Sequence, residues 1–325
     1  MAISNLARSL AVALALTAPM FGHAAVQYPS QPIKMIVPFP AGGQGIDMVS
    51  RTISKRLSEI TGQSAVVDNR PGAGTIIGSS MVAKAPNDGY TLLVMANSFT
   101  VNPSIQSDLP YDTRADFAPV ALLTITPHVL VARKALPVNE LKSLIELGKE
   151  KPGSITYASI GNGTSPHLAG EMLKKLAGVN FVHVPYKGTP LAITALLGEH
   201  VDLLFGNLPD VLPYIQDGRL KPIAISATQR HASMPDVPTM GEAGFPEFES
   251  NSWYGIVAPA GTSPEVIGQL NTLLVQILSE KPIRDSFAER GLDVIASTPE
   301  EFQAWLNKEI DKYAQVIKDS GAHID

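Results

Sequence analysis

The sequence predicts an α/β fold of two lobes, each a mainly parallel sheet flanked by helices, with two crossing strands as the hinge. Short apolar runs alternate with amphipathic stretches along the chain, which is typical of strands joined by right-handed helical crossovers. The 325 residues are too many for one ordinary hydrophobic core. Two apolar passages, at residues 120–132 and 253–258, are expected to cross between the lobes. We therefore expect domain 1 to comprise residues 25–125 and 228–325, and domain 2 to comprise residues 126–227.

Residues 1–24 are predicted to be a signal peptide. Arg8 precedes an apolar run at residues 10–16, and small residues follow at the spacing that a signal peptidase recognises. Cleavage after Ala24 leaves a mature chain that begins at Ala25. No later apolar run is long enough to span a membrane. We therefore expect export to the periplasm, with no membrane insertion by the protein itself.

The composition narrows the class of partner. The chain holds 25 Lys and Arg against 30 Asp and Glu, a formal net charge of −5. Proteins that bind nucleic acid cluster basic residues against the phosphates, so no nucleic-acid partner is expected. Cysteine is absent from the sequence, which excludes disulfides, thiolate metal sites, a thiol nucleophile and a lipid-anchored form.

The first mature segment predicts a strand at residues 33–37, a Pro/Gly turn and a helix that opens near Gly45. Three- and four-residue spacings place one apolar face on this helix, made by Ile46, Val49, Ile53, Leu57 and Ile60. A strand that runs through glycines into a helix N-terminus presents unpaired backbone N–H groups and the positive end of the helix dipole. This loop is therefore a candidate anion cradle.

The next elements complete a βαβαβ unit. Strands are expected at residues 65–68 and 91–95, with a helix at residues 75–84 between them. Ligands of such sheets bind outside the carboxyl ends of the strands. This rule places residues 38–45 and 96–103 at the binding edge.

Three glycines imitate a dinucleotide-binding fingerprint between these strands. Gly72, Gly74 and Gly78 follow a strand and precede a helix. However, residues 68–71 separate the strand from the glycines, and no acidic residue follows the strand at 91–95 to bind a ribose. A turn with close helix packing is the preferred interpretation.

The second lobe is predicted to repeat the architecture after the crossing, which carries Thr126 and Pro127 in its middle. Helices are expected at residues 139–149, 165–176, 191–197 and 209–216, and strands at residues 155–158, 181–184, 201–205 and 221–225. A Pro- and Gly-rich passage then returns the chain to the strand at 253–258 and three C-terminal helices. Two crossings make a hinge, and a hinge between lobes makes a cleft.

A second anion cradle is expected in this lobe. Gly161 and Gly163 follow a strand, and Thr164 or Ser165 is the N-cap of the next helix. Cradles on facing lobes could hold a carboxylate from both sides as the cleft shuts, and the Thr164 hydroxyl is expected to donate to it. His167 lies just inside the helix, where a hydrogen bond to the loop is favoured over contact with a ligand.

An enzyme is disfavoured. The sequence lacks the G-x-S-x-G, H-E-x-x-H and P-loop motifs, and its histidines show no metal-ligand spacing. His167 and Glu171 are one turn apart, but such a helix-surface pair is more often structural. A transcription regulator with similar lobes would need a helix-turn-helix in place of the leader, and none is present.

Ordered motifs across the mature chain resemble the Bug family, the extracytoplasmic solute receptors of tripartite tricarboxylate transporters. They are "YPSQPIKMIVPFPAGG", "VDNRPGAGTIIGSSMVAKAPNDGYTLL", "YDTRADFAPVALL", "HVPYKGTPLAITALLGEHVDLLF", "GRLKPIAISATQR" and "DVPTMGEAGFPEFESNSWYGIVAPAGTS". The resemblance implies a type II periplasmic-binding-protein fold and no catalysis. It also implies a small organic carboxylate as ligand and an integral-membrane permease as partner. An exported carboxylate sensor that signals to a membrane partner is the alternative. A monomer without cofactor or metal is expected.

The resemblance also implies which residues bind the ligand. They are Phe39, Ala41, Gly42, Gly43, Gln44, Asn97, Ser98, Gly163, Thr164, His167, Tyr186 and Asn207. Asp47 is left with two roles: it could pair with a ligand ammonium, or it could cap the first helical turn. Capping is favoured, because a carboxylate that faces a bound carboxylate would repel it.

Two departures from the family pattern bear on the ligand's outer part. The loop between Gly43 and Asp47 is one residue longer than usual, and Gly206 stands where many relatives have Asp. With that acid missing and Asp210 expected a turn further on, the ligand is predicted to be a mono- or dicarboxylate without an amine. Lys187 is expected near the mouth of the cleft. The apolar part of the ligand is expected to lie against Phe39 and Tyr186.

Overall fold

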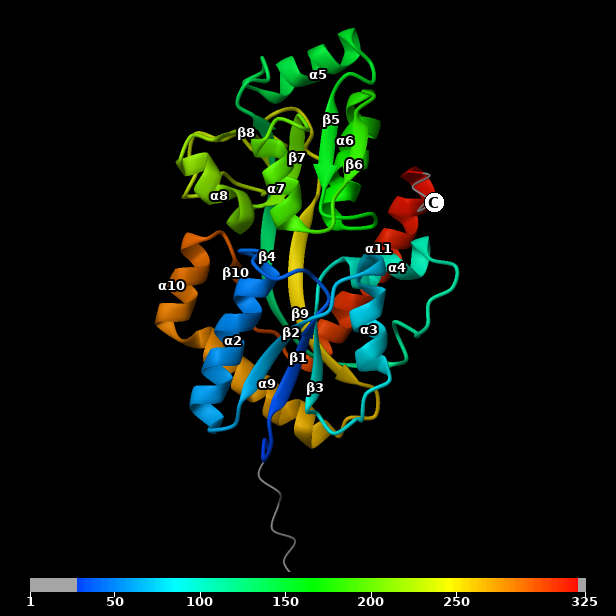
Figure 1. The fold of residues 1–325 in the computed structure, drawn as a ribbon, viewed down its shortest axis with the longest axis vertical. Helices are drawn as coiled ribbons and strands as arrows, with labels where there is room; N and C mark the ends of the chain where they lie inside the picture. Colours follow the sequence, from blue (N-terminus) through cyan, green and yellow to red (C-terminus); the bar gives the residue numbers. More distant parts are fainter. Residues whose placement is uncertain (1–27, 321–325) are drawn as a thin grey trace, which may run out of the picture.

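The computed structural model describes residues 28–320, so the predicted leader at residues 1–24 lies outside the described residues. The molecule is elongated, with two lobes stacked along its long axis (Figure 1). Two long strands, β4 (Phe117–Arg133) and β9 (Asn251–Pro259), join the lobes. Both correspond to the crossings that the sequence predicts.

Lobe 1, the lower one in Figure 1, contains the first strands and the C-terminal helices. Its strands besides the crossings are β1 (Ile33–Val37), β2 (Ala65–Asn69), β3 (Thr91–Met95) and β10 (Asp293–Val294). Its helices are α2 (Ile46–Thr61), the 3-10 turn η1 (Ala73–Thr75), α3 (Ile76–Ala83), α4 (Ser98–Ile105), α9 (Pro264–Ser279), α10 (Lys281–Glu289) and α11 (Pro299–Ser320).

Lobe 2, the upper one, is built from the middle of the chain. Its strands besides the crossings are β5 (Thr156–Ser159), β6 (Val182–Pro185), β7 (Leu203–Asn207) and β8 (Leu220–Ile225). Its helices are α5 (Leu141–Glu150), α6 (Ser165–Ala177), α7 (Thr189–Leu197) and α8 (Leu208–Gln216). Every predicted strand and helix of this lobe is present, with ends shifted by a few residues.

The strands form one mixed sheet in the order β2-β1-β3-β9-β4-β7-β5-β6, with β8 and β10 also paired to β4. The predicted parallel pairing holds for β1 with β2 and β3, and for β5 with β6 and β7. The crossing strands pair antiparallel with each other and with their neighbours. The predicted domain boundary between residues 125 and 126 falls inside β4, and the division into two domains stays a prediction.

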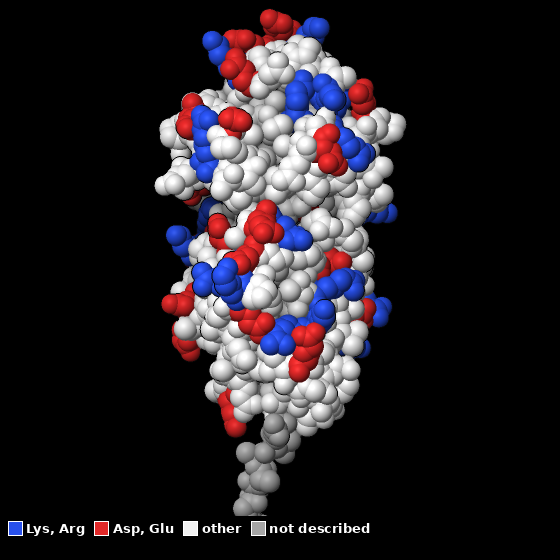
Figure 2. Space-filling model, turned by 90° about the vertical axis from the view of Figure 1, so that its left-hand side faces the viewer, with Lys and Arg blue, Asp and Glu red and all other residues white. Residues whose placement is uncertain are grey.

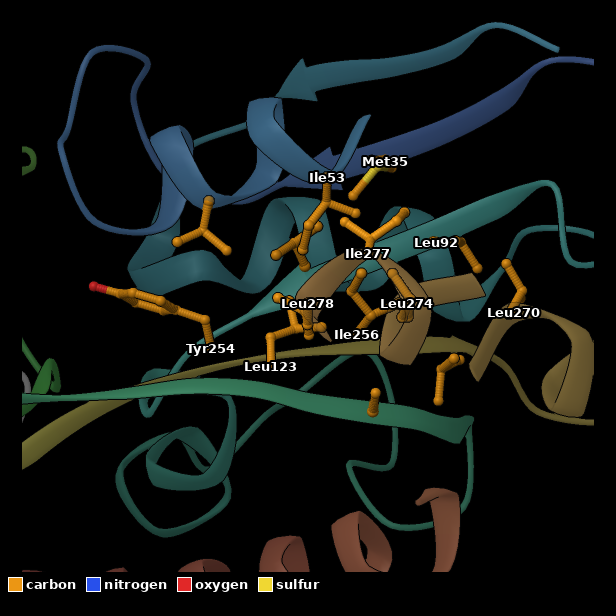
Figure 3. Close-up of a cluster of buried hydrophobic side chains, with 14 of the residues drawn as sticks. Met35, Ile53, Leu92, Leu123, Tyr254, Ile256, Leu270, Leu274, Ile277 and Leu278 are labelled. Carbon is orange, nitrogen blue, oxygen red and sulfur yellow. The ribbon is translucent and has the colours of Figure 1, made fainter. Parts of the chain in front are cut away.

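The core of lobe 1 shows why α2 forms where its apolar spacing predicts. Val49, Ile53 and Leu57 are fully buried on one helix face. They pack with sheet residues such as Met35 and with the α9 face that includes Leu274 (Figure 3). Burying side chains of this size contributes roughly 1.5–3 kcal/mol each. The helix is thereby held with its N-terminus toward the other lobe.

Helix α4 has no counterpart in the prediction. Its sequence, SFTVNPSI, is rich in residues with weak helix propensity and contains Pro103. Tertiary packing overrides that preference, because Phe99 is buried and packs its ring edge-on against Phe117, with centroids 4.9 Å apart. This packing places the N-terminus of α4 at the carboxyl end of β3.

Candidate functional site

One cavity lies between the two lobes at the carboxyl ends of β1, β3, β5 and β7. Lobe 1 and the strand β9 contribute Phe39, Pro40, Gly43, Gly45, Ile46, Ala96, Asn97, Ser98, Ser252 and Tyr254. Lobe 2 contributes Ile160, Thr164, Ser165, Thr189, Pro190, Asn207 and Asp210. The centre of a water molecule can reach about 30 Å³ of it, room for about two waters. A molecule much larger than this does not fit in the space between the lobes as the structure has them.

Helix N-termini from both lobes point toward this cavity. In lobe 1, α2 begins after Gly45 and α4 after Asn97; in lobe 2, α6 begins after Thr164 and α8 after Asn207. Each N-terminus carries partial positive charge and backbone N–H groups. Among the described residues that line the cavity, none is Lys or Arg. Among these lining residues, the helix N-termini rather than basic side chains therefore supply partial positive charge.

Ser98 lines the cavity and has an unpaired hydroxyl within the described residues. Its side chain is 3 % exposed, and its Oγ has no hydrogen-bond partner within residues 28–320. The hydroxyl of Thr164, by contrast, donates to the carbonyl oxygen of Gly161 at 2.7 Å. Its one proton is therefore already used, which weakens the expectation that Thr164 donates to a carboxylate.

The position of Asp210 corrects the prediction. Asp210 was expected a turn beyond the site, but β7 continues to Asn207 and α8 begins directly after it, and Asp210 lies in the cavity wall. Its carboxylate accepts hydrogen bonds from Gln44 N at 2.7 Å, Gly45 N at 3.2 Å and Asn207 Nδ2 at 3.0 Å. Burial raises the pKa of Asp210 above its ordinary value, although these three donors oppose the shift.

Asp47 serves the loop rather than the cavity. It does not line the cavity, and its carboxylate accepts from Gly42 N at 2.9 Å, Asn69 Nδ2 at 2.9 Å and Arg51 Nε at 3.0 Å. Burial opposes ionisation, but the hydrogen bonds from Arg51, Gly42 and Asn69 outweigh it and hold the pKa of Asp47 below its usual value. Neither role left open is seen as such: Asp47 does not line the cavity, and its backbone donor is Gly42 in the preceding loop, so it makes no side-chain cap of α2.

His167 also bonds its own loop. Its Nδ1 accepts from Gly163 N at 3.2 Å, and its ring stacks on His183 with centroids 4.1 Å apart. Burial lowers the pKa of His167, and so does the charge of Lys174, while Glu171 opposes the shift. The favoured interpretation, a histidine hydrogen-bonded to the loop, agrees with these contacts.

The structure brings about half of the predicted site residues to the cavity. Those that line it are Phe39, Gly43, Asn97, Ser98, Thr164 and Asn207. Those that do not are Ala41, Gly42, Gln44, Asp47, Gly163, His167 and Tyr186. The side chain of Asn97 is engaged at the hinge, where its amide donates to Asn251 O at 3.1 Å and to Tyr313 Oη at 2.9 Å.

Two functional candidates on β9 were missed. Tyr254 closes one end of the lobe 1 core, and its hydroxyl points away from the aliphatic side chains (Figure 3). That hydroxyl is buried and has no partner in the described chain. A Cβ added to Gly45 would lie 2.4 Å from the Tyr254 hydroxyl oxygen. The backbone can approach the tyrosine this closely because Gly45 has no side chain. Ser252, the other candidate, gives no local signal in the sequence either.

A buried hydrogen-bond network connects the hinge to the cavity. His128 on β4 contacts Ser252 Oγ through Nε2 at 3.1 Å and Ser250 Oγ through Nδ1 at 2.7 Å. Ser252 donates to Asn207 Oδ1 at 2.7 Å. Burial lowers the pKa of His128 to about 3, so this histidine is neutral and a poor base at physiological pH. The Ser–His contacts are therefore structural.

The described residues offer neither a metal site nor a membrane-spanning helix. Residues 28–320 contain no group of three or more His, Asp or Glu that could hold a metal ion. In the same residues, no helix is both long and apolar enough to cross a membrane. Positive and negative side chains are interspersed over both lobes of the face shown in Figure 2.

Comparison with known proteins places the chain in a family. Residues 49–322 match the tripartite tricarboxylate transporter family receptor. Protein BugT of Bordetella pertussis is 37% identical over 299 residues, which cover 91% of each chain. The structure of the periplasmic binding protein BugD has a TM-score of 0.86 and 34% identity, covering 91% of this chain and 99% of that one. The structure of Rpa4515 of R. palustris with adipate has a TM-score of 0.88 and 33% identity, covering 91% and 100%.

These matches confirm the resemblance to the Bug proteins and the two-lobed fold of periplasmic binding proteins. They also agree with a binding site that lacks catalytic chemistry, since the family consists of solute-binding receptors and not of enzymes. The chain therefore belongs to the tripartite tricarboxylate transporter receptor family.

Proposed function

We propose that this protein is a periplasmic receptor that captures a small organic carboxylate in the cleft between its lobes and delivers it to a membrane permease. Membership of the receptor family supports the binding role, and the adipate bound by a relative supports the carboxylate. Export through the leader at residues 1–24 and transfer to the permease of a tripartite tricarboxylate transporter are parts of the same proposal.

The arrangement of helix N-termini around an unpaired hydroxyl is the structural observation that best supports the proposal. The N-termini of α4 and α6 come from different lobes and meet at one cavity, where the Ser98 hydroxyl is buried without a partner in the described residues. A buried donor that lacks an acceptor costs free energy, and a carboxylate oxygen satisfies it with a charge-assisted bond. Helix dipoles from both sides stabilise the same negative charge. The carboxylate is thus expected to lie between Ser98 and Thr164.

The two lobes are proposed to act as the two domains of a clamp. A ligand that contacts both lobes favours the closed form by the difference in its affinity for the closed and open forms. Residues 25–125 with 228–325, and residues 126–227, would then move relative to each other about β4 and β9. Pro40 and Gly188 support this picture, because a Cβ on Gly188 would lie 2.7 Å from Pro40 across the cleft.

A thermal-shift screen of the mature protein tests the proposal. Organic acids of three to eight carbons are compared with nucleotides and sugars at equal concentration. A receptor with a Kd near 1 μM, about −8 kcal/mol, gains about 2.7 kcal/mol of stability at a hundredfold excess of ligand. At least one acid should raise Tm. If a nucleotide or a sugar raises Tm and no organic acid does, the protein is not a carboxylate receptor and the proposal is wrong. N-terminal sequencing of periplasmic extract tests export and should begin at Ala25.

A further inference from the structure

The anion cradle at the N-terminus of α2 is filled by the protein itself. The Asp210 carboxylate of lobe 2 accepts from Gln44 N at 2.7 Å and from Gly45 N at 3.2 Å, both in lobe 1. The amide of Gly42, in the same loop, is taken by Asp47 at 2.9 Å. Three backbone donors of this loop, on Gly42, Gln44 and Gly45, are therefore bound to side-chain carboxylates.

Asp210 also sets the charge of the cavity. It is 3 % exposed, and it is the one ionisable acid or base among the lining residues other than Tyr254. Lys187, which was expected near the mouth of the cleft, does not line the cavity. No basic side chain among the lining residues offsets a second carboxylate. A dicarboxylate in this closed cavity would put three carboxylates within one site.

The Asp210 carboxylate has an acceptor position left over, which indicates the kind of ligand group that could bind beside it. A carboxylate offers about four acceptor positions, and Gln44, Gly45 and Asn207 use three of them. The Tyr254 hydroxyl lies beside the same loop, buried and without a partner in the described residues. A ligand hydroxyl could donate to Asp210 and accept from Tyr254, and a ligand ammonium could donate to Asp210 and pack against the Tyr254 ring. A ligand carboxylate could accept from Tyr254 but has no proton to donate to Asp210, and the Asp210 carboxylate would repel it.

We propose that Asp210 determines ligand specificity by occupying the α2 cradle: the ligand carries one carboxylate, bound near Ser98, and a hydroxyl or ammonium group that faces Asp210. This inference rests on the proposed function and names the substrate class more closely. It reverses the expectation of a ligand without an amine, which assumed that Asp210 lay away from the site. Gln44 N, Gly45 N and Asn207 Nδ2 all donate to the Asp210 carboxylate and favour its ionised form against the effect of burial. A second carboxylate in the same site is then repelled, which gives the discrimination.

The test uses ligands that differ only at the end opposite the carboxylate. Butyrate, 4-hydroxybutyrate, 4-aminobutyrate and succinate share a four-carbon chain, and matched sets of three, five and six carbons cover other lengths. Affinities are measured by calorimetry for the full mature protein, for Asp210→Asn, for Asp210→Ser and for Asp217→Asn. Asp217 is exposed at the end of the same helix, so its variant makes the same charge change outside the cavity.

The wild type should bind the hydroxy or amino acid at least about tenfold more tightly than the dicarboxylate of equal length. Asp210→Asn or Asp210→Ser should reduce that ratio by at least about tenfold, while Asp217→Asn leaves it unchanged. Tightest wild-type binding of a dicarboxylate overturns the inference, whether or not the variants fold. So does a ratio that is the same in wild type and in a folded Asp210 variant. These outcomes leave the carboxylate receptor intact, whereas binding of no acid at any length overturns the proposed function and this inference with it.

Discussion

Replacement of Ser98 by Ala separates binding from folding. In most buried sites, loss of a serine hydroxyl breaks a structural hydrogen bond and destabilises the fold. Ser98 Oγ makes no such bond within residues 28–320, so its removal leaves no protein group unpaired. Ala also has the higher helix propensity at the first residue of α4. The free energy of unfolding should therefore stay within about 0.5 kcal/mol of the wild type or rise slightly.

Ligand affinity should respond very differently. A hydrogen bond to a charged group contributes about 1.5–3 kcal/mol. At 1.4 kcal/mol per factor of ten, Ser98→Ala should weaken carboxylate binding by about tenfold to about 150-fold. Calorimetry with the tightest acid from the thermal-shift screen measures this change, and urea unfolding measures stability on the same samples.

Ser79→Ala is the matched control. Ser79 is a fully buried serine on α3 of the same lobe, and it does not line the cavity. This control should leave the affinity unchanged. If Ser98→Ala binds the acid as tightly as the wild type, the carboxylate does not contact α4, and the placement of the ligand between α4 and α6 is wrong.

Three further predictions follow from the same geometry. Gly45→Ala should weaken binding at least about tenfold, because its Cβ would lie 2.4 Å from Tyr254 Oη. Gly268→Ala on α9, outside the cavity and with nothing within 4 Å of the added Cβ, is the calorimetric control and should bind normally. Thr164→Val should change affinity less than about threefold, since its hydroxyl proton is already donated within its own loop; a larger loss would show that the bond switches to the ligand. The free energy of unfolding should fall by up to about 4 kcal/mol between pH 6.5 and about pH 3, because His128 binds a proton in the unfolded chain but not in the folded one, where its pKa is lowered to about 3. Urea unfolding of His128→Gln across that range should lack this part of the pH dependence. The same pH profile in the variant and the wild type would contradict a buried, neutral His128.

The elements that the sequence predicted well are those whose pattern matches their surroundings. The strand at 33–37 is observed with the predicted ends, and α2 begins directly after Gly45. Both have strong local signals, since a buried apolar run and a 3.6-residue period each favour one structure. Helix α4 was missed because its stability comes from aromatic packing with Phe117, which is distant in the sequence.

The sequence predicted which loops form the site, but not which of their hydrogen-bond donors are available to a ligand. Strand-to-helix loops rich in glycine are visible in the sequence, and they do meet at the cavity through Gly43 and Thr164. Which backbone donors remain available depends on the other lobe, and no local pattern reveals that Asp210 reaches the loop of α2. Asp210 was expected a turn beyond the site, whereas α8 begins directly after Asn207 and Asp210 lines the cavity.

A crystal structure of the mature protein with the tightest-binding acid would show where the carboxylate binds. We expect one carboxylate between the lobes, with an oxygen within about 3 Å of Ser98 Oγ and near the N-terminus of α6. An acid bound outside the cleft, or one bound in the cleft with its carboxylate away from both α4 and α6, would show that the proposed carboxylate site is wrong.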